Sequence, residues 1–95
     1  MEIFKISSSK KKELERILNI DDISRLSITV RDSTILGKEG FQYIILEGPE
    51  ERLKTAREEF KTISEKIENE EKDKVKDYIE KERDSVYNGL GSIFG

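Results

Sequence analysis

The chain contains no cysteine, no histidine and no tryptophan among its 95 residues. Without cysteine there can be no disulfide framework of the kind that holds small secreted domains together. Zinc, haem and thiol chemistry also lose their usual ligands and nucleophiles. No apolar run approaches the roughly 18 residues of a membrane-spanning helix, and the start lacks the apolar core of a signal peptide. These absences predict a soluble, cytoplasmic protein without cofactor, metal or membrane contact.

Charge is what the chain has in excess. Charged residues make up 41% of the sequence and hydrophobic residues 34%, with a net charge of −3. An average domain is about 25% charged, so part of this chain should be a solvated helix or tail. The acidic total argues against strong, non-specific binding to duplex DNA. The abundance of Lys, Glu and Arg, with a single Gln, is typical of thermophile proteins.

Hydrophobic periodicity predicts three strands and two helices. Strands are expected near residues 3–6 and over Arg25 to Arg31, where apolar and polar side chains alternate, and again over 41–47. A first helix is expected to end at Asn19. The second helix begins at Gly48-Pro49 and has its apolar positions at spacings of three and four residues. Those positions are Leu53, Ala56, Phe60, Ile63 and Ile67.

This order of elements predicts an α+β two-layer sandwich. Residues 1–67 fit a ferredoxin-like βαββα(β) arrangement, in which a last strand comes from the tail or is missing. Residues 68–95 form a charged C-terminal helix followed by an apolar, glycine-containing tail. Either one helix runs from Pro49 to Asp84, or the chain breaks near Asn69 and the last helix folds back.

Catalytic signatures are missing from the sequence. Gly37-Lys38 has no glycine five residues before it and no Ser or Thr after it, so it is not a phosphate-binding loop. Asp21-Asp22 lacks the spaced oxygens of a calcium loop. The helical carboxylates stand four residues from lysines, as in Asp77/Lys81, which solvated ion pairs explain. The sequence therefore predicts no enzyme and no catalytic residue.

One segment carries a family resemblance. Residues 39–46, EGFQYIIL, resemble the third-strand motif of the RNA recognition motif family through their glycine, the aromatics Phe41 and Tyr43, and an aliphatic residue. Phe4 is similar to that family's first-strand aromatic, and the resemblance extends over residues 1–65. It implies an open sheet face on which bases of single-stranded RNA stack.

The outer sheet face therefore has two interpretations. Phe41 and Tyr43 should point away from the helices together with Arg25 and Arg31, and aromatics interleaved with arginine can bind single strands. Alternatively this apolar face is covered by the C-terminal helix and tail or by a second subunit. We favour coverage.

Two other features attract attention. Lys10, Lys11 and Lys12 stand at a helix start, where positive charge opposes the helix dipole; they mark either an anion site or a solvated first turn. Leu90, Ile93 and Phe94 lie in the apolar tail, which either docks on the same chain or binds another protein.

The leading hypothesis is thus a non-enzymatic protein-interaction or oligomerisation module, with a homo-oligomer as the expected assembly. The alternative is a single-stranded RNA-binding module that uses the aromatic and basic residues.

Overall fold

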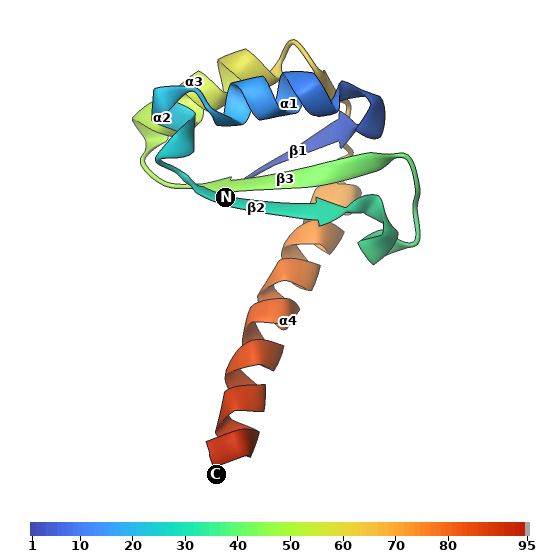
Figure 1. Ribbon diagram of the computed structural model, residues 1–95. Coiled ribbons are helices and arrows are strands. Elements are labelled where there is room, and N and C mark those ends of the chain that lie inside the picture. The colour runs from blue at the N-terminus through green and yellow to red at the C-terminus, as the bar shows by residue number, and fades with distance from the viewer. Residues whose placement is uncertain (95) are drawn as a thin grey trace.

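A four-stranded antiparallel sheet carries helices on both of its faces (Figure 1). The structure, a computed structural model, describes the backbone of residues 1–94 and the side chains of residues 1–85. The α+β class predicted from the sequence is confirmed. In chain order the elements are β1 (Glu2–Ser7), the 3₁₀ helix η1 (Ser8–Lys10), α1 (Lys11–Leu18), α2 (Asp21–Ser24), β2 (Ser27–Asp32), the 3₁₀ helix η2 (Ser33–Leu36), β3 (Phe41–Glu47), α3 (Glu50–Phe60), β4 (Ser64–Glu65) and α4 (Asn69–Phe94).

The strands lie in the order β2-β3-β1-β4. The central strand β3 pairs over its length with β1 on one side and with β2 on the other. Tyr43 of β3 stands opposite Lys5 of β1 and opposite Arg31 of β2. Directly opposed residues point to the same face of a sheet. The register therefore places a phenol between a lysine and an arginine on one face.

The larger core lies between the sheet and the layer formed by α1, α2 and α3. The rings of Phe4 and Phe60 stack there, with centroids 4.5 Å apart and planes inclined by 13°. The buried residues of this core are Ile6, Leu14, Ile17, Ile23, Leu26, Ile44, Leu46, Leu53, Ala56 and Phe60.

A smaller core lies on the opposite face, under α4. Val75 and Ile79 of α4 are fully buried. They pack against residues of β1 and β3 that the alternation of the strands directs away from the first core. The buried members of this second core are Ile3, Tyr43, Ile45, Val75 and Ile79. The sheet is therefore covered on both faces, and α4 belongs to the packed structure.

The second predicted helix is shorter than its periodicity indicated. α3 ends at Phe60, and the prediction of a helix through Ile67 is wrong. Ile63 packs against the first core and Ile67 against the second. Since these cores lie on opposite faces of the sheet, the chain has to leave the helix and cross the sheet edge between the two isoleucines.

That crossing supplies the last strand. Ser64 and Glu65 form β4, which pairs with Ile6 and Lys5 of β1. The prediction that a last strand would come from the tail or be missing is wrong. The chain also breaks before Asn69, where α4 begins, so the continuous helix from Pro49 to Asp84 does not form.

The second predicted strand begins two residues later than expected and ends one residue later. β2 begins at Ser27, and Arg25 is the C-cap of α2 instead of a strand residue. After β2 the chain turns into η2, where the Asp32 side chain accepts a hydrogen bond from the Thr34 N–H. Gly37 ends η2 with a φ of 71°, a left-handed conformation that favours glycine.

Candidate functional site

The most chemically distinctive region is the contact between α4 and the sheet. α4 crosses the face that bears Lys5, Tyr43 and Arg31. Glu71, in its first turn, contacts Lys5 and Tyr43, and Glu82, three turns later, contacts Arg31. The two carboxylates therefore contact opposite ends of the row that Lys5, Tyr43 and Arg31 form across the sheet.

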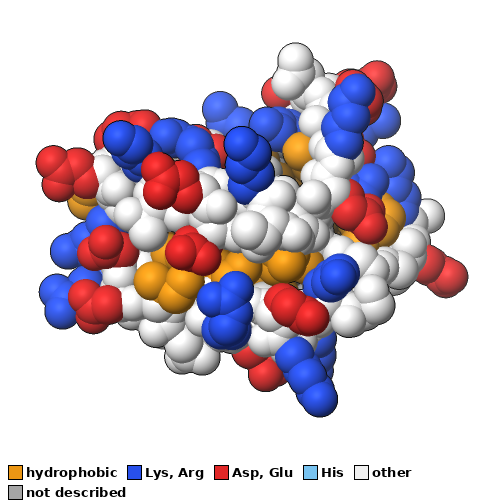
Figure 2. Space-filling view, turned by 90° about the horizontal axis from the view of Figure 1, so that it is seen from above, with side chains coloured by type: hydrophobic (Ala, Val, Ile, Leu, Met, Phe, Trp, Pro, Cys, Tyr) orange, Lys and Arg blue, Asp and Glu red, His pale blue; other side chains and the backbone are white. Residues whose placement is uncertain are grey.

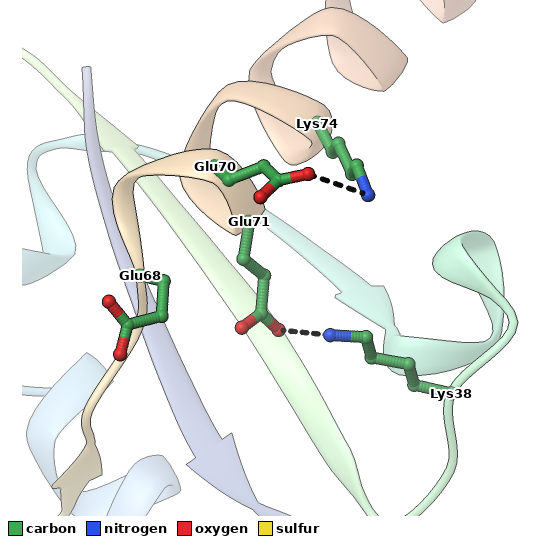
Figure 3. A pocket seen from close by; sticks show the side chains of 5 residues that line it. All are labelled: Lys38, Glu68, Glu70, Glu71 and Lys74. Atoms are coloured by element: carbon green, nitrogen blue, oxygen red, sulfur yellow. Dashed lines mark ion pairs between the residues drawn. The ribbon is translucent and has the colours of Figure 1, made fainter.

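Glu71 is the centre of a nearly buried ionic cluster. Its side chain is 9% exposed, and its Oε2 accepts a hydrogen bond of 2.5 Å from the Tyr43 hydroxyl. The same oxygen lies 3.4 Å from the Lys5 Nζ and 3.5 Å from the Lys38 Nζ. Figure 3 shows Lys38 reaching the carboxylate from the loop before β3. One carboxylate thus joins β1, β3, that loop and α4.

The electrostatics of this cluster favour a charged Glu71. Burial would raise the pKa of Glu71 and is the largest single influence, but the Tyr43 hydrogen bond and the two lysines together outweigh it, so the pKa lies below its ordinary value. Burial, and next the hydrogen bond to Glu71, raise the pKa of Tyr43 well above its ordinary value. The pair is therefore a neutral phenol donating to a carboxylate at neutral pH.

Two further ion pairs hold the later turns of α4. The guanidinium of Arg31 donates through Nε and Nη2 to Glu82, with the Nε 3.2 Å from each carboxylate oxygen. Arg83 donates to Glu47 at the end of β3 over 2.5 Å. Side chains in both pairs are a third to a half exposed. Solvent screens such pairs, so they orient α4 on the sheet and add little to stability.

A hollow of about 200 Å³ opens beside Glu71. It is lined by Lys38, Glu68, Glu70, Glu71 and Lys74 (Figure 3). The charges in it are already paired, since Lys38 reaches Glu71, Lys74 lies 3.5 Å from Glu70, and Glu68 lies 3.5 Å from Lys66. No buried polar side-chain atom lacks a hydrogen-bond partner within the described side chains. The hollow therefore leaves no unsatisfied group that calls for a bound ion.

The described part of the chain contains no cluster of metal-ligating side chains. No group of three or more Asp, Glu, His or Cys residues there could hold a metal ion. A second hollow, of about 330 Å³, lies along α4 and is lined by Tyr78, Lys81, Glu82 and Ser85.

The structure brings together three of the residues singled out in the sequence. Phe41, Tyr43 and Arg31 lie on the α4 face, with the rings of Phe41 and Tyr43 edge to face at 5.4 Å. The Lys5 Nζ lies 4.1 Å from the centroid of the Phe41 ring. Tyr43 is nonetheless fully buried under α4. The interpretation that the C-terminal helix covers this face agrees with the structure.

The other predicted basic residues lie elsewhere. Arg25 does not share the face with Tyr43, because it caps α2 and pairs with Asp21 at 3.4 Å. Lys10, Lys11 and Lys12 are exposed at η1 and the start of α1, in the helical layer on the other side of the sheet. Figure 2 shows that layer from outside, with positive and negative side chains mixed across it. The mixture produces no field of a single sign.

Phe4 also differs from its expected place. Matching it to the strand-1 aromatic of the RNA recognition motif would place it on the outer face, whereas it stacks on Phe60 in the helical core. Lys5 takes the outer position instead. Leu90, Ile93 and Phe94 belong to the backbone of α4, and their side chains lie outside the described residues.

Sequence reasoning missed the ionic cluster at Glu71. The only signal for it was Lys5, a charged residue inside an apolar strand. Glu71 stands in a run of seven residues without an apolar side chain, 68–74, and nothing in that run separates it from its exposed neighbours. Pairing across 66 residues of sequence is decided by the fold.

Comparison with known proteins adds no relative. No protein family, no curated protein and no solved structure matches the chain.

Proposed function

We propose that this protein is a non-enzymatic protein-interaction and oligomerisation module whose association element is the end of α4. One observation carries the proposal. α4 has 26 residues, roughly 39 Å at 1.5 Å per residue, and among the side chains that the structure describes its polar contacts with the sheet extend from Glu71 to Arg83. Figure 1 shows its last turns running on beyond the sheet.

The composition of those last turns supports an association role. From Ser85 to Gly95 the sequence has no charged residue. Val86, Leu90 and Ile93 follow Ile79 at spacings of seven, four and three, which place them on the face of a helix that Ile79 shares. In the first part of α4 this face packs on the sheet. Its apolar continuation favours contact with a further surface.

The low intrinsic helix propensity of the end of α4 also supports an association role. Gly89 and Gly91 each disfavour a helix by about 1 kcal/mol relative to alanine. The segment also has no charged pair to offset that cost. A helix of this composition is stabilised by tertiary or quaternary packing and not by its own propensity.

The fold itself supports a ferredoxin-like arrangement. The order β2-β3-β1-β4, with helices after β1 and β3 on one face, is the one expected of a split βαβ fold. Such folds host many unrelated activities, so the arrangement does not select among functions. The RNA-binding alternative has less support, because Tyr43 is buried and Arg31 is paired with Glu82.

The test compares the full chain with a Leu90→Asp/Ile93→Asp double variant. Two carboxylates on the apolar face should abolish association, because burying them without partners is costly. We expect the solution mass from light scattering to fall toward 11.1 kDa, the mass of one chain. Thermal stability of the sandwich should change little.

Asn88→Asp is the matched control, since it adds a carboxylate to the same segment on the opposite side of the helix. It should keep the wild-type mass. If the double variant, the control and the wild type share one mass and one response to an apolar dye, the end of α4 is not an association element and the proposal fails.

A further inference from the structure

The outer edge of β2 offers a complete surface for another strand. β2 stands at the end of the sheet order and pairs only with β3. Its six residues contain no proline, and all six are paired with β3 in regular succession. The edge therefore lacks the proline or bulge that commonly blocks pairing. At the opposite edge, β4 has only two residues.

The side chains of β2 are consistent with an uncovered edge. Ile28, Thr29, Val30 and Arg31 are each only partly buried, whereas four successive residues of β3, from Tyr43, are fully buried. The carbonyl oxygen of Val30 accepts a hydrogen bond of 2.8 Å from the Arg31 guanidinium, a donor that the N–H of a neighbouring strand could replace.

We propose that β2 pairs antiparallel with β2 of a second copy of this chain, so that two sheets join into one; this inference names the partner and rests on the proposed function. A two-fold axis perpendicular to the sheet keeps corresponding faces on one side. Only registers that oppose residues of the same face are then allowed.

One such register is well matched. With the axis at Thr29, Thr29 faces its own copy, Ile28 faces Val30, and Ser27 faces Arg31. Apolar residues then meet on the face of the larger core, and no like charges are opposed. Threonine pairs and apolar β-branched pairs are favourable across strands.

The course of α4 fits the same assembly. α4 passes from Tyr43 in the sheet centre to Arg31 at the β2 side, and Figure 1 shows it continuing past β2. In the paired form the last turns of α4 would run onto the neighbouring copy. The uncharged segment after Asp84 and the open edge would then contribute to one interface.

Introducing a charge at residue 29, next to the two-fold axis, provides the test. Thr29→Lys and Thr29→Asp each place two like charges opposite one another in the paired form, which disfavours pairing. We expect the wild type to have twice the 11.1 kDa chain mass by light scattering and each variant alone to have half the wild-type mass. An equal mixture of the two variants should regain the wild-type mass, because Lys then faces Asp.

Thr34→Lys is the matched control, because Thr34 is exposed on η2 and lies outside the residues of β2 that would pair. It should keep the wild-type mass. Circular dichroism checks that each variant is folded, and recovery in the mixture cannot arise from unfolded chains. A monomeric wild type, or Thr29 variants that keep the wild-type mass, would overturn the inference. If these variants stay associated while Leu90→Asp/Ile93→Asp dissociates, only the strand pairing fails and the proposed function remains.

Discussion

At the scale of single residues, the carboxylate of Glu71 joins α4 to the sheet. Among the described side chains it is the one buried carboxylate, and it contacts Tyr43, Lys5 and Lys38 together. A buried carboxylate is tolerated because its oxygens are hydrogen-bonded and paired. Glu71 therefore specifies how the first turn of α4 meets the sheet.

Replacing this carboxylate tests its role. Glu71→Gln leaves two lysines near a neutral amide and should lower the free energy of unfolding by about 1–3 kcal/mol, the cost of leaving buried partners unsatisfied. Glu70→Gln is the control, because Glu70 is the adjacent residue and its side chain is 83% exposed. It should change stability by less than about 0.5 kcal/mol. Urea unfolding at neutral pH measures both, and equal effects would contradict the role given to Glu71.

At the scale of elements, α4 is the helix whose position could not be read from local pattern. Its first part presents a narrow apolar face, in which Val75 and Ile79 are the buried apolar residues between charged turns. Those two side chains complete a core that the sheet alone would leave open. Docking of α4 is therefore a tertiary event, stabilised by few but fully buried residues.

Truncating one of these side chains should release the helix. Ile79→Ala removes buried methyl groups and should cost about 2–5 kcal/mol, as for other core isoleucines. Lys76→Ala, at an exposed position of the same helix, should stay within about 0.5 kcal/mol. Denaturant unfolding followed by circular dichroism gives both values. A loss below about 1 kcal/mol in Ile79→Ala would mean that α4 does not pack on the sheet.

At the scale of the whole molecule, the shifted pKa values of several side chains make the free energy of unfolding depend on pH. The pKa values of Asp32, Glu50, Glu71 and Glu82 lie below their ordinary values. Such groups bind protons more readily in the unfolded chain, so they stabilise the fold above pH about 4 and lose that contribution as the pH falls. Tyr43 acts in the opposite direction, because its raised pKa favours the fold below pH about 10 and the benefit disappears as the pH rises.

The variant Tyr43→Phe isolates the contribution that ionisation of Tyr43 makes to the loss of stability at alkaline pH. Tyr43→Phe cannot ionise, so the loss of stability above pH about 10 should be smaller than in the wild type. At neutral pH it should be about 0.5–1.5 kcal/mol less stable, because Glu71 loses a hydrogen bond. Tyr78→Phe is the control, since Tyr78 is exposed on α4. Urea unfolding across alkaline pH gives the comparison, and parallel pH curves for Tyr43→Phe and the wild type would refute it.

Local pattern predicted the elements that stay within one layer of the fold. β3 follows from its dense aromatic and β-branched residues and the start of α3 from Pro49, and neither element leaves its layer, although β3 contacts both cores. Prediction failed where the chain changes layer. Between Phe60 and Asn69 the spacing of Ile63 and Ile67 still suited a helix, yet those residues serve opposite faces of the sheet. Periodicity records that a side chain is apolar, not which core receives it.

The sequence by itself determined the α+β class, the lack of histidine and cysteine chemistry, the direction of Phe41 and Tyr43 away from the layer of α1, α2 and α3, and the uncharged end of the chain. Those properties depend on composition and on alternation within a few residues. The tertiary structure alone decided that α4 covers Tyr43, that Glu71 meets Lys5 and Lys38, and that β2 is left at an edge. These features depend on contacts between residues far apart in the chain. The free energy of such contacts comes from burial and pairing in the folded state, so the contacts leave no local pattern in the sequence.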